Sequence, residues 1–217
     1  MKRLLLSLLA VSAAWAQVAT EANRVYESAE GRHRMIETLA SPERPTELQA
    51  EKIVADLKLA PGSTVVDLGT GAGMLLPFLS RAVGTDGKVI AQDIYGDFLD
   101  AAREAAGRKD LANVEFLLGD ERNPRLPEAA ADLVIAVDAY HHFSYPAEML
   151  AGIRRALRPG GRLVIVDYYQ NGFHDPDHIR LDKLDVVREI ASNGFRLLSN
   201  NEHVPGVQYN LEFRSDR

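Results

Sequence analysis

The chain of 217 residues contains no cysteine. Disulfide bonds, thiolate-bound metals and cysteine nucleophiles are therefore excluded, while the redox state of the compartment is left open. A net positive charge is also missing. The chain has 25 Lys and Arg and 31 Asp and Glu, which gives a net charge of −6. This balance does not favour a nucleic-acid partner, and we expect the ligands to be small molecules.

Long apolar runs are equally absent. No stretch reaches the roughly 18 apolar residues that a membrane-spanning helix needs, and no repeat of fixed period is present. The hydrophobic content of 46% and the charged content of 26% are those of an ordinary globular protein. The length is suited to one α/β domain with short extensions.

The first residues, MKRLLLSLLAVSAAWAQ, resemble an export signal. Lys2 and Arg3 precede a short apolar run, and Ala14 and Ala16 form a small-residue cleavage pattern. We therefore expect residues 1–16 to be a signal peptide, so that the mature protein is periplasmic or secreted and is not inserted in a membrane. The alternative is an amphipathic first helix on a cytoplasmic protein.

Two units are expected after the signal. Residues 17–45 are predicted to form a helical extension or lid, which ends in the turn SPERP, and residues 46–217 a single domain. Helical spacing after residue 46 makes Thr46 a candidate N-cap. The same reasoning makes Asp97 and Ser144 the candidate N-caps of later helices, and the last helix is bounded by Asp182 and Gly194.

Strands and helices then alternate along the chain. Strands are predicted at 63–68, 87–93, 113–120, 131–138 and 158–169, and helices at 74–83, 96–108, 144–157 and 182–193. Two further strands, 195–204 and 207–214, have no helix between them and are expected to pair antiparallel. The pattern predicts an α/β fold with a mostly parallel sheet covered on both faces, whose ligands lie beyond the carboxyl ends of the strands.

The stretch VVDLGTGAG, residues 65–73, predicts a buried strand that turns sharply into a nucleotide site. A phosphate-binding loop of the Gly-x-x-x-x-Gly-Lys-Ser/Thr type is absent from the chain. A dinucleotide fingerprint requires a third glycine where this chain has Met74. Asp67 would repel a pyrophosphate, whereas it would attract a sulfonium or an amino group.

Four stretches in order carry a resemblance to a known family. They are DLGTGAG, Asp93 at the end of the second strand, Gly119-Asp120 at the end of the third, and LRPGGRL at the start of the fifth. With these, the chain resembles the class I S-adenosylmethionine-dependent methyltransferases, in the group that includes the ubiquinone and menaquinone methyltransferases. The resemblance implies a Rossmann-like, doubly wound sheet of seven strands with a reversed C-terminal strand. It also implies S-adenosylmethionine as co-substrate and no metal.

The resemblance also implies roles for individual residues. The backbone of Gly69 to Gly73 would approach the methionyl part, Asp67 its amino group, and Asp93 the ribose hydroxyls. Ile94 and Tyr95 would lie against the adenine. The full set of expected co-substrate contacts is Asp67, Gly69, Thr70, Gly71, Gly73, Asp93, Ile94, Tyr95, Asp120 and Asp138. The simpler interpretation of Asp97, Asp120 and Asp138 is that they are cap or turn residues.

The acceptor side is expected after the fourth strand, in VDAYHHF. Tyr140, His141 and His142 are the candidates for orienting an acceptor or removing its proton. For each of them, a satisfied polar residue packed against the next helix is the alternative.

Two polar segments are expected near the same site. HDPDH contains His174 and His178, but Pro176 prevents a regular helix, so we expect a polar loop and no metal site. By analogy with family lids, the extension would bring Tyr26 and Arg34 to the pocket. The absence of cysteine argues against cysteine-dependent arsenite methylation.

The leading hypothesis is methyl transfer from S-adenosylmethionine to an O, N or C nucleophile of a small molecule by direct displacement. The alternative is an exported, non-catalytic nucleotide- or small-molecule-binding protein that retains the fold. A dehydrogenase is disfavoured by the glycine spacing and by Asp67. The sequence carries no signal for the identity of the acceptor or for an oligomeric state.

Overall fold

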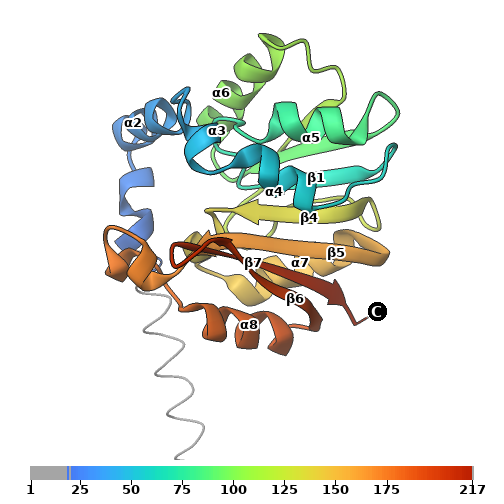
Figure 1. Ribbon diagram of the computed structural model, residues 1–217. Coiled ribbons are helices and arrows are strands. Elements are labelled where there is room, and N and C mark those ends of the chain that lie inside the picture. The colour runs from blue at the N-terminus through green and yellow to red at the C-terminus, as the bar shows by residue number, and fades with distance from the viewer. Residues whose placement is uncertain (1–18, 20, 217) are drawn as a thin grey trace, which may run out of the picture.

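A computed structural model describes residues 19 and 21–216, so that the predicted signal peptide lies outside the described residues (Figure 1). Within this part of the chain, one sheet has the strand order β3-β2-β1-β4-β5-β7-β6. Neighbouring strands pair parallel except β7, which is antiparallel to both β5 and β6. The strands are β1 (Thr64–Leu68), β2 (Lys88–Asp93), β3 (Val114–Leu118), β4 (Ala131–Val137), β5 (Leu157–Tyr168), β6 (Phe195–Val204) and β7 (Gln208–Ser215). The prediction of a mostly parallel seven-stranded sheet with a reversed C-terminal strand is confirmed.

Helices cover both faces of this sheet (Figure 1). On one face lie α4 (Ala50–Asp56), α5 (Leu76–Val83) and α6 (Gly96–Gly107), and on the other α7 (Pro146–Ala156) and α8 (Lys183–Ser192). Two more helices, α2 (Ala29–Leu39) and α3 (Arg44–Glu47), belong to the N-terminal part of the described chain. Short 3-10 helices occupy Arg24–Tyr26, Tyr140–His142, Gln170–Gly172 and Pro176–His178. None of the described helices has the length and apolar character that crossing a bilayer requires.

The core consists of two layers, one on each side of the sheet. Val66, Val134 and Ile165 pack with α7 and α8, and their strand neighbours pack with α4, α5 and α6. Successive side chains of a strand point to opposite faces. Strands covered on both faces are therefore apolar at consecutive positions, which explains the runs of Val, Ile and Leu in the sequence.

All three predicted N-caps are wrong. Thr46 lies inside α3, and the chain breaks before α4 at Gln49, which adopts a φ of +47°. Asp97 lies in the first turn of α6, after the N-cap Tyr95. Ser144 precedes the N-cap Tyr145, because Pro146 fixes the first turn of α7.

Candidate active site

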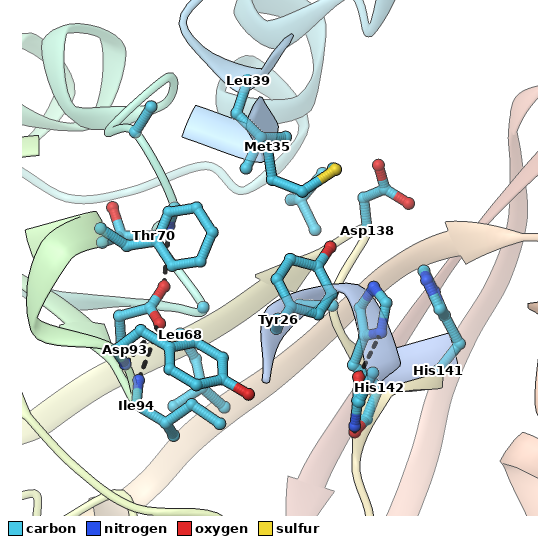
Figure 2. A pocket seen from close by; sticks show the side chains of 18 of the residues that line it. Tyr26, Met35, Leu39, Leu68, Thr70, Asp93, Ile94, Asp138, His141 and His142 are labelled. Carbon is cyan, nitrogen blue, oxygen red and sulfur yellow. Dashed lines mark hydrogen bonds between the residues drawn. The ribbon is translucent and has the colours of Figure 1, made fainter. Parts of the chain in front are cut away.

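A cavity of about 550 Å³ lies at the carboxyl ends of β1, β2, β4 and β5 (Figure 2). This is the edge where the sheet topology predicts a ligand. The turn after β1, the end of β2, the segment after β4 and the N-terminal extension all contribute to its wall. Of the sequence-predicted residues, it brings together Gly69, Thr70, Gly71, Asp93, Ile94, Tyr95, Asp138, His141 and His142.

At one end of the cavity, Asp93 closes β2. Its Oδ2 accepts a hydrogen bond from the Gly71 backbone N–H at 3.0 Å, and its Oδ1 accepts from Ile94 at 2.8 Å and Tyr95 at 3.1 Å. Burial raises the pKa of this carboxyl, and the three backbone donors oppose the rise. A carboxylate has about four acceptor positions, so these bonds leave capacity for a ribose hydroxyl.

The glycine turn forms the wall beside Asp93. Gly69, Thr70 and Gly71 line the cavity, whereas Gly73 lies behind it at a φ of +82°. A Cβ on Gly73 would lie 2.9 Å from Leu76 Cδ1 and 3.2 Å from the Cα of Ala102. The turn therefore brings bare backbone to the cavity and packs closely against α5 and α6 on its other side.

Asp67 does not line the cavity. Its Oδ2 accepts a hydrogen bond from Thr70 Oγ1 at 2.8 Å, and the side chain is buried. Burial raises the pKa of this carboxyl from 3.8 to about 7, although the Thr70 hydroxyl opposes the rise. Asp67 thus holds Thr70, which does line the cavity, and a contact to a bound amino group through Thr70 or water stays a prediction.

Asp120 also lies outside the cavity wall. Its carboxylate accepts from the backbone of Arg122 and Asn123, both at 2.9 Å, and pairs with Arg125 at 3.1 Å. These bonds, the backbone of Arg122 first, lower the pKa of the carboxyl. This is the arrangement of a turn residue, which was the simpler interpretation of the sequence. Glu121, which sequence reasoning missed, lines the cavity in its place.

Asp138 lines the cavity just beyond the end of β4. It adopts a φ of +54°, which is uncommon for a residue other than glycine and is concentrated at functional sites. Its Oδ2 accepts from Arg44 Nη2 at 2.6 Å, and both side chains are largely buried. Sequence reasoning missed Arg44, because nothing in the pattern relates residues that are 94 positions apart.

Two histidines lie at the other end of the cavity. Nδ1 of His141 donates to Asp167 Oδ1 at 2.7 Å, and its backbone N–H donates to Oδ2 at 3.0 Å. Burial lowers the pKa of His141, but the carboxylate of Asp167 outweighs burial and the net shift is upward. Burial and the neighbouring His141 hold the pKa of His142 well below its usual value. His142 is therefore a neutral imidazole at neutral pH.

Tyr140 does not take the predicted acceptor-side position. The side chain is fully buried, and its hydroxyl donates to Glu189 Oε1 at 2.6 Å. Glu189 also binds the buried Arg180 through both carboxylate oxygens. Tyr140 is thus a satisfied polar residue beneath the site, and Tyr168 at the end of β5 lines the cavity instead.

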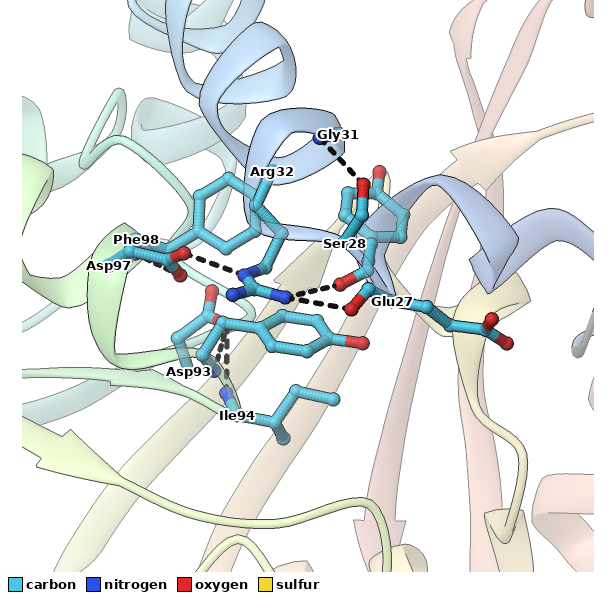
Figure 3. Close-up of polar contacts among 10 residues, drawn as sticks. Glu27, Ser28, Gly31, Arg32, Asp93, Ile94, Asp97 and Phe98 are labelled. Carbon is cyan, nitrogen blue, oxygen red and sulfur yellow. Dashed lines mark hydrogen bonds and ion pairs between the residues drawn. The ribbon is translucent and has the colours of Figure 1, made fainter.

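The N-terminal extension covers the cavity. Tyr26 stacks on Tyr95 at 5.9 Å between ring centroids and meets the ring of His142 edge-on at 5.3 Å. Arg32 holds this segment in place, because Nε donates to Asp97 Oδ2 at 2.6 Å and Nη1 donates to the Tyr26 carbonyl at 2.8 Å (Figure 3). The prediction for Tyr26 agrees with this placement. Arg34 is exposed and does not line the cavity, so the prediction for Arg34 is wrong.

The loop after β5 closes the histidine end. Phe173, His174 and His178 line the cavity there, and the ring centroid of His178 lies 5.3 Å from that of His141 and 5.2 Å from that of His142. The predicted polar loop therefore lies at the site.

Comparison with known proteins agrees with this geometry. Residues 65–161 match a family model described as a methyltransferase domain. An arsenite methyltransferase of Halobacterium salinarum is 35% identical over 124 residues, which is 57% of this chain and 32% of that protein. A ubiquinone/menaquinone biosynthesis C-methyltransferase, UbiE of Pseudomonas fluorescens, is 30% identical over 49% of this chain and 42% of its own length. The chain thus spans less than half of these curated relatives.

Solved structures extend the likeness over most of the chain. A SAM-dependent methyltransferase from Aquifex aeolicus has a TM-score of 0.78 and 29% identity, covering 83% of this chain and 96% of that one. The [4+2]-cyclase SpnF, with a TM-score of 0.66 and 18% identity over 77% of this chain and 81% of its own, shares the fold alone. The motif order, the sheet topology and these matches together support a class I S-adenosylmethionine-dependent methyltransferase.

Proposed function

We propose that the protein transfers the methyl group of S-adenosylmethionine to an O, N or C nucleophile of a small molecule by direct displacement. One observation carries the proposal: a single cavity contains both the glycine turn with Asp93 and the histidine end with His141 and Asp138. A donor and an acceptor can therefore share one space, which direct displacement requires.

The residues at the glycine end fit the co-substrate. Bare backbone at Gly69 and Gly71, and the unused acceptor capacity of Asp93, match an amino-acid portion and a ribose. Ile94 and Tyr95 give an apolar and an aromatic surface for the adenine. S-adenosylmethionine bound there would supply a methyl group on a sulfonium, from which the neutral thioether is a good leaving group.

The chain's own residues at the other end hold the acceptor. Phe143, Tyr168 and Phe173 line this part of the cavity and favour an acceptor with an apolar or aromatic ring. Asp167 accepts the hydrogen bond from His141 Nδ1, so that in the neutral ring Nε2 has a lone pair for a hydroxyl or amine of the acceptor. Tyr26 and Met35 from the extension cover the space and exclude water.

The SpnF likeness shows that the fold is compatible with another reaction, so transfer must be measured directly. Full-length protein is incubated with S-adenosylmethionine labelled in the methyl group and with a panel of phenols, quinols and amines. We expect label in at least one acceptor, and a loss of transfer in His141→Ala with S-adenosylhomocysteine binding retained. Binding of the co-substrate without transfer to any member of the panel would contradict the proposal and favour the non-catalytic alternative.

A further inference from the structure

Three histidines from two segments meet at the acceptor end of the cavity. One ring nitrogen from each of His141, His142 and His178 lies within 4.8 Å of those of the other two. His141 and His142 follow β4, whereas His178 ends the 3-10 helix Pro176–His178 after β5. All three line the cavity, so a ligand held between them would face the acceptor.

The hydrogen bonds of His142 fix its tautomer. Asn23 Nδ2 donates to the backbone carbonyl of His142 at 2.8 Å and also lies 3.3 Å from Ser144 Oγ, its second partner. A carbonyl can only accept, so the amide of Asn23 cannot be turned around. Its Oδ1, 2.7 Å from His142 Nδ1, is therefore an acceptor, and Nδ1 carries the proton. Nε2 of His142 is left with a lone pair.

His141 has the same arrangement with a stronger partner. Asp167 Oδ1 accepts from Nδ1, and the carboxylate also accepts from the backbone of His141 and of Tyr168. Nδ1 is thus the donor, and in the neutral ring Nε2 carries the lone pair. Histidines that bind metals almost always donate their other ring N–H to a carboxylate, a backbone carbonyl or water, which fixes the tautomer and the orientation of the ring. Asp167 and the amide oxygen of Asn23 are in this position here.

We propose that His141, His142 and His178 form a site for one divalent transition-metal ion, with Zn²⁺ the best match. Three imidazoles are a ligand set for zinc and its neighbours, and a poor one for Mg²⁺ or Ca²⁺, which prefer oxygen ligands. Tetrahedral coordination at bond lengths near 2.0–2.1 Å needs nitrogens roughly 3.4 Å apart. From separations within 4.8 Å, the ring nitrogens must approach one another by up to about 1.4 Å, which the half-buried His178 on its loop can provide.

A three-histidine zinc site keeps a fourth position for water or substrate. Here that position faces the cavity, because the ligands themselves line it. A hydroxyl or amine of the acceptor bound there would have a lowered pKa and would present its heteroatom as the nucleophile. This consequence rests on the proposed function, whereas binding of the ion does not.

Calorimetric titration with ZnCl₂, without co-substrate or acceptor, tests the site. The full-length chain is prepared without a histidine tag and dialysed against EDTA. Visible absorption of Co²⁺ gives an independent readout of tetrahedral coordination. The variants are His178→Ala, which removes a ligand, and Asn23→Ala, which removes the acceptor of the His142 Nδ1 hydrogen bond. His33→Ala is the matched control, because His33 is an exposed histidine on α2 that pairs with Glu37 and does not line the cavity.

We expect one equivalent of Zn²⁺ to bind. Affinity should fall about 10- to 100-fold in Asn23→Ala and further in His178→Ala, with no change in His33→Ala. If His178→Ala does not fold, as judged by circular dichroism, His178→Asn serves in its place. Absence of stoichiometric binding, or equal affinity in wild type and the His178 variant, would overturn the proposal. If zinc binds but methyl transfer is insensitive to EDTA, the metal site is supported and the proposed binding of the acceptor to the ion is refuted.

Discussion

Replacement of Asp67 by Asn should make the free energy of unfolding less dependent on pH. Asp67 is 3% exposed, and its one side-chain donor is Thr70. Burial raises the pKa of its carboxyl from 3.8 to about 7, a difference of about 3 units. Each unit corresponds to about 1.36 kcal/mol, so ionised Asp67 costs the folded state about 4 kcal/mol.

The sign follows from proton binding. Between pH 3.8 and about 7 the folded protein keeps the Asp67 proton that the unfolded chain has released. The stability that protonated Asp67 provides is therefore fully present below about pH 4, falls as pH rises toward 7, and is gone above it. Asn at the same position cannot ionise and can still accept from Thr70, so the variant lacks this slope.

Urea unfolding of both proteins from about pH 4 to about pH 8 measures the difference. The gain in unfolding free energy of Asp67→Asn over wild type should grow by about 4 kcal/mol across this interval and then level off. In Thr70→Val, Asp67 has lost the hydrogen bond that opposes the rise of its pKa. The pH at which the unfolding free energy stops falling should therefore be higher in this variant. A difference between Asp67→Asn and wild type that is constant with pH would refute the assignment of a buried carboxyl with a raised pKa.

Three further predictions concern the turn, the donor end and the N-terminus. Gly73→Ala should lower the unfolding free energy by about 2–4 kcal/mol, because it adds crowding against Leu76 and Ala102 to a left-handed backbone. Gly62 has a φ of +84°, and apart from its chain neighbours no atom of the described residues lies within 4 Å of an added Cβ. Gly62→Ala should therefore lose only about 1 kcal/mol, and equal losses in the two variants would contradict the crowding. Calorimetry should show that S-adenosylhomocysteine binds about 10- to 100-fold more weakly to Asp93→Ala, since a charged hydrogen bond contributes about 1.5–3 kcal/mol. Binding should be unchanged in the matched control Asp120→Ala. Equal affinities in the two variants would show that Asp93 does not bind the ribose. Cell fractionation with N-terminal sequencing should find an exported chain that begins at Gln17, and an intact Met1 in the cytoplasmic fraction would contradict the predicted export signal.

The fold was largely predictable because its signals are local. Strands buried on both faces are apolar at consecutive positions, as in VVDL and LVIV, and amphipathic helices separate them. The glycine turn and Asp93 follow their strands directly, so the parallel order of the sheet places them together without further information. Helix starts were less predictable, since the fixed φ of Pro146 took precedence over Ser144, and Gln49 divided one expected helix into two.

Contacts made by the N-terminal extension were not predictable in the same way. Arg44 meets Asp138, and Asn23 meets His142, across 94 and 119 positions of the chain. No periodicity relates such pairs, because the path of the extension over the cavity depends on tertiary contacts such as Arg32 with Asp97. Arg34 was expected at the cavity by analogy alone, but it lies on the exposed side of α2. The presence of a covering segment was therefore predictable, whereas which of its residues face the cavity was not.

At the histidine end of the cavity, Asp167 was predictable from its position at a strand end, whereas His178 was not. Asp167 stands one residue before the end of β5, in the same class of position as Asp93 at the end of β2, so the strand-end rule could have assigned it to the site. A carboxylate there beside His141 would then have indicated an oriented imidazole. His178 lies 36 positions beyond His142, on a loop that Pro176 keeps out of a regular helix, and its direction follows from packing against Phe173 at 5.2 Å. Pro176 does prevent a regular helix, so His174 and His178 do not share a helical face. It says nothing about ligands that come from two different loops, as His142 and His178 do. Residues that neither motif nor period joins can still form one site, because parallel strands bring all the loops at their carboxyl ends to the same edge of the sheet.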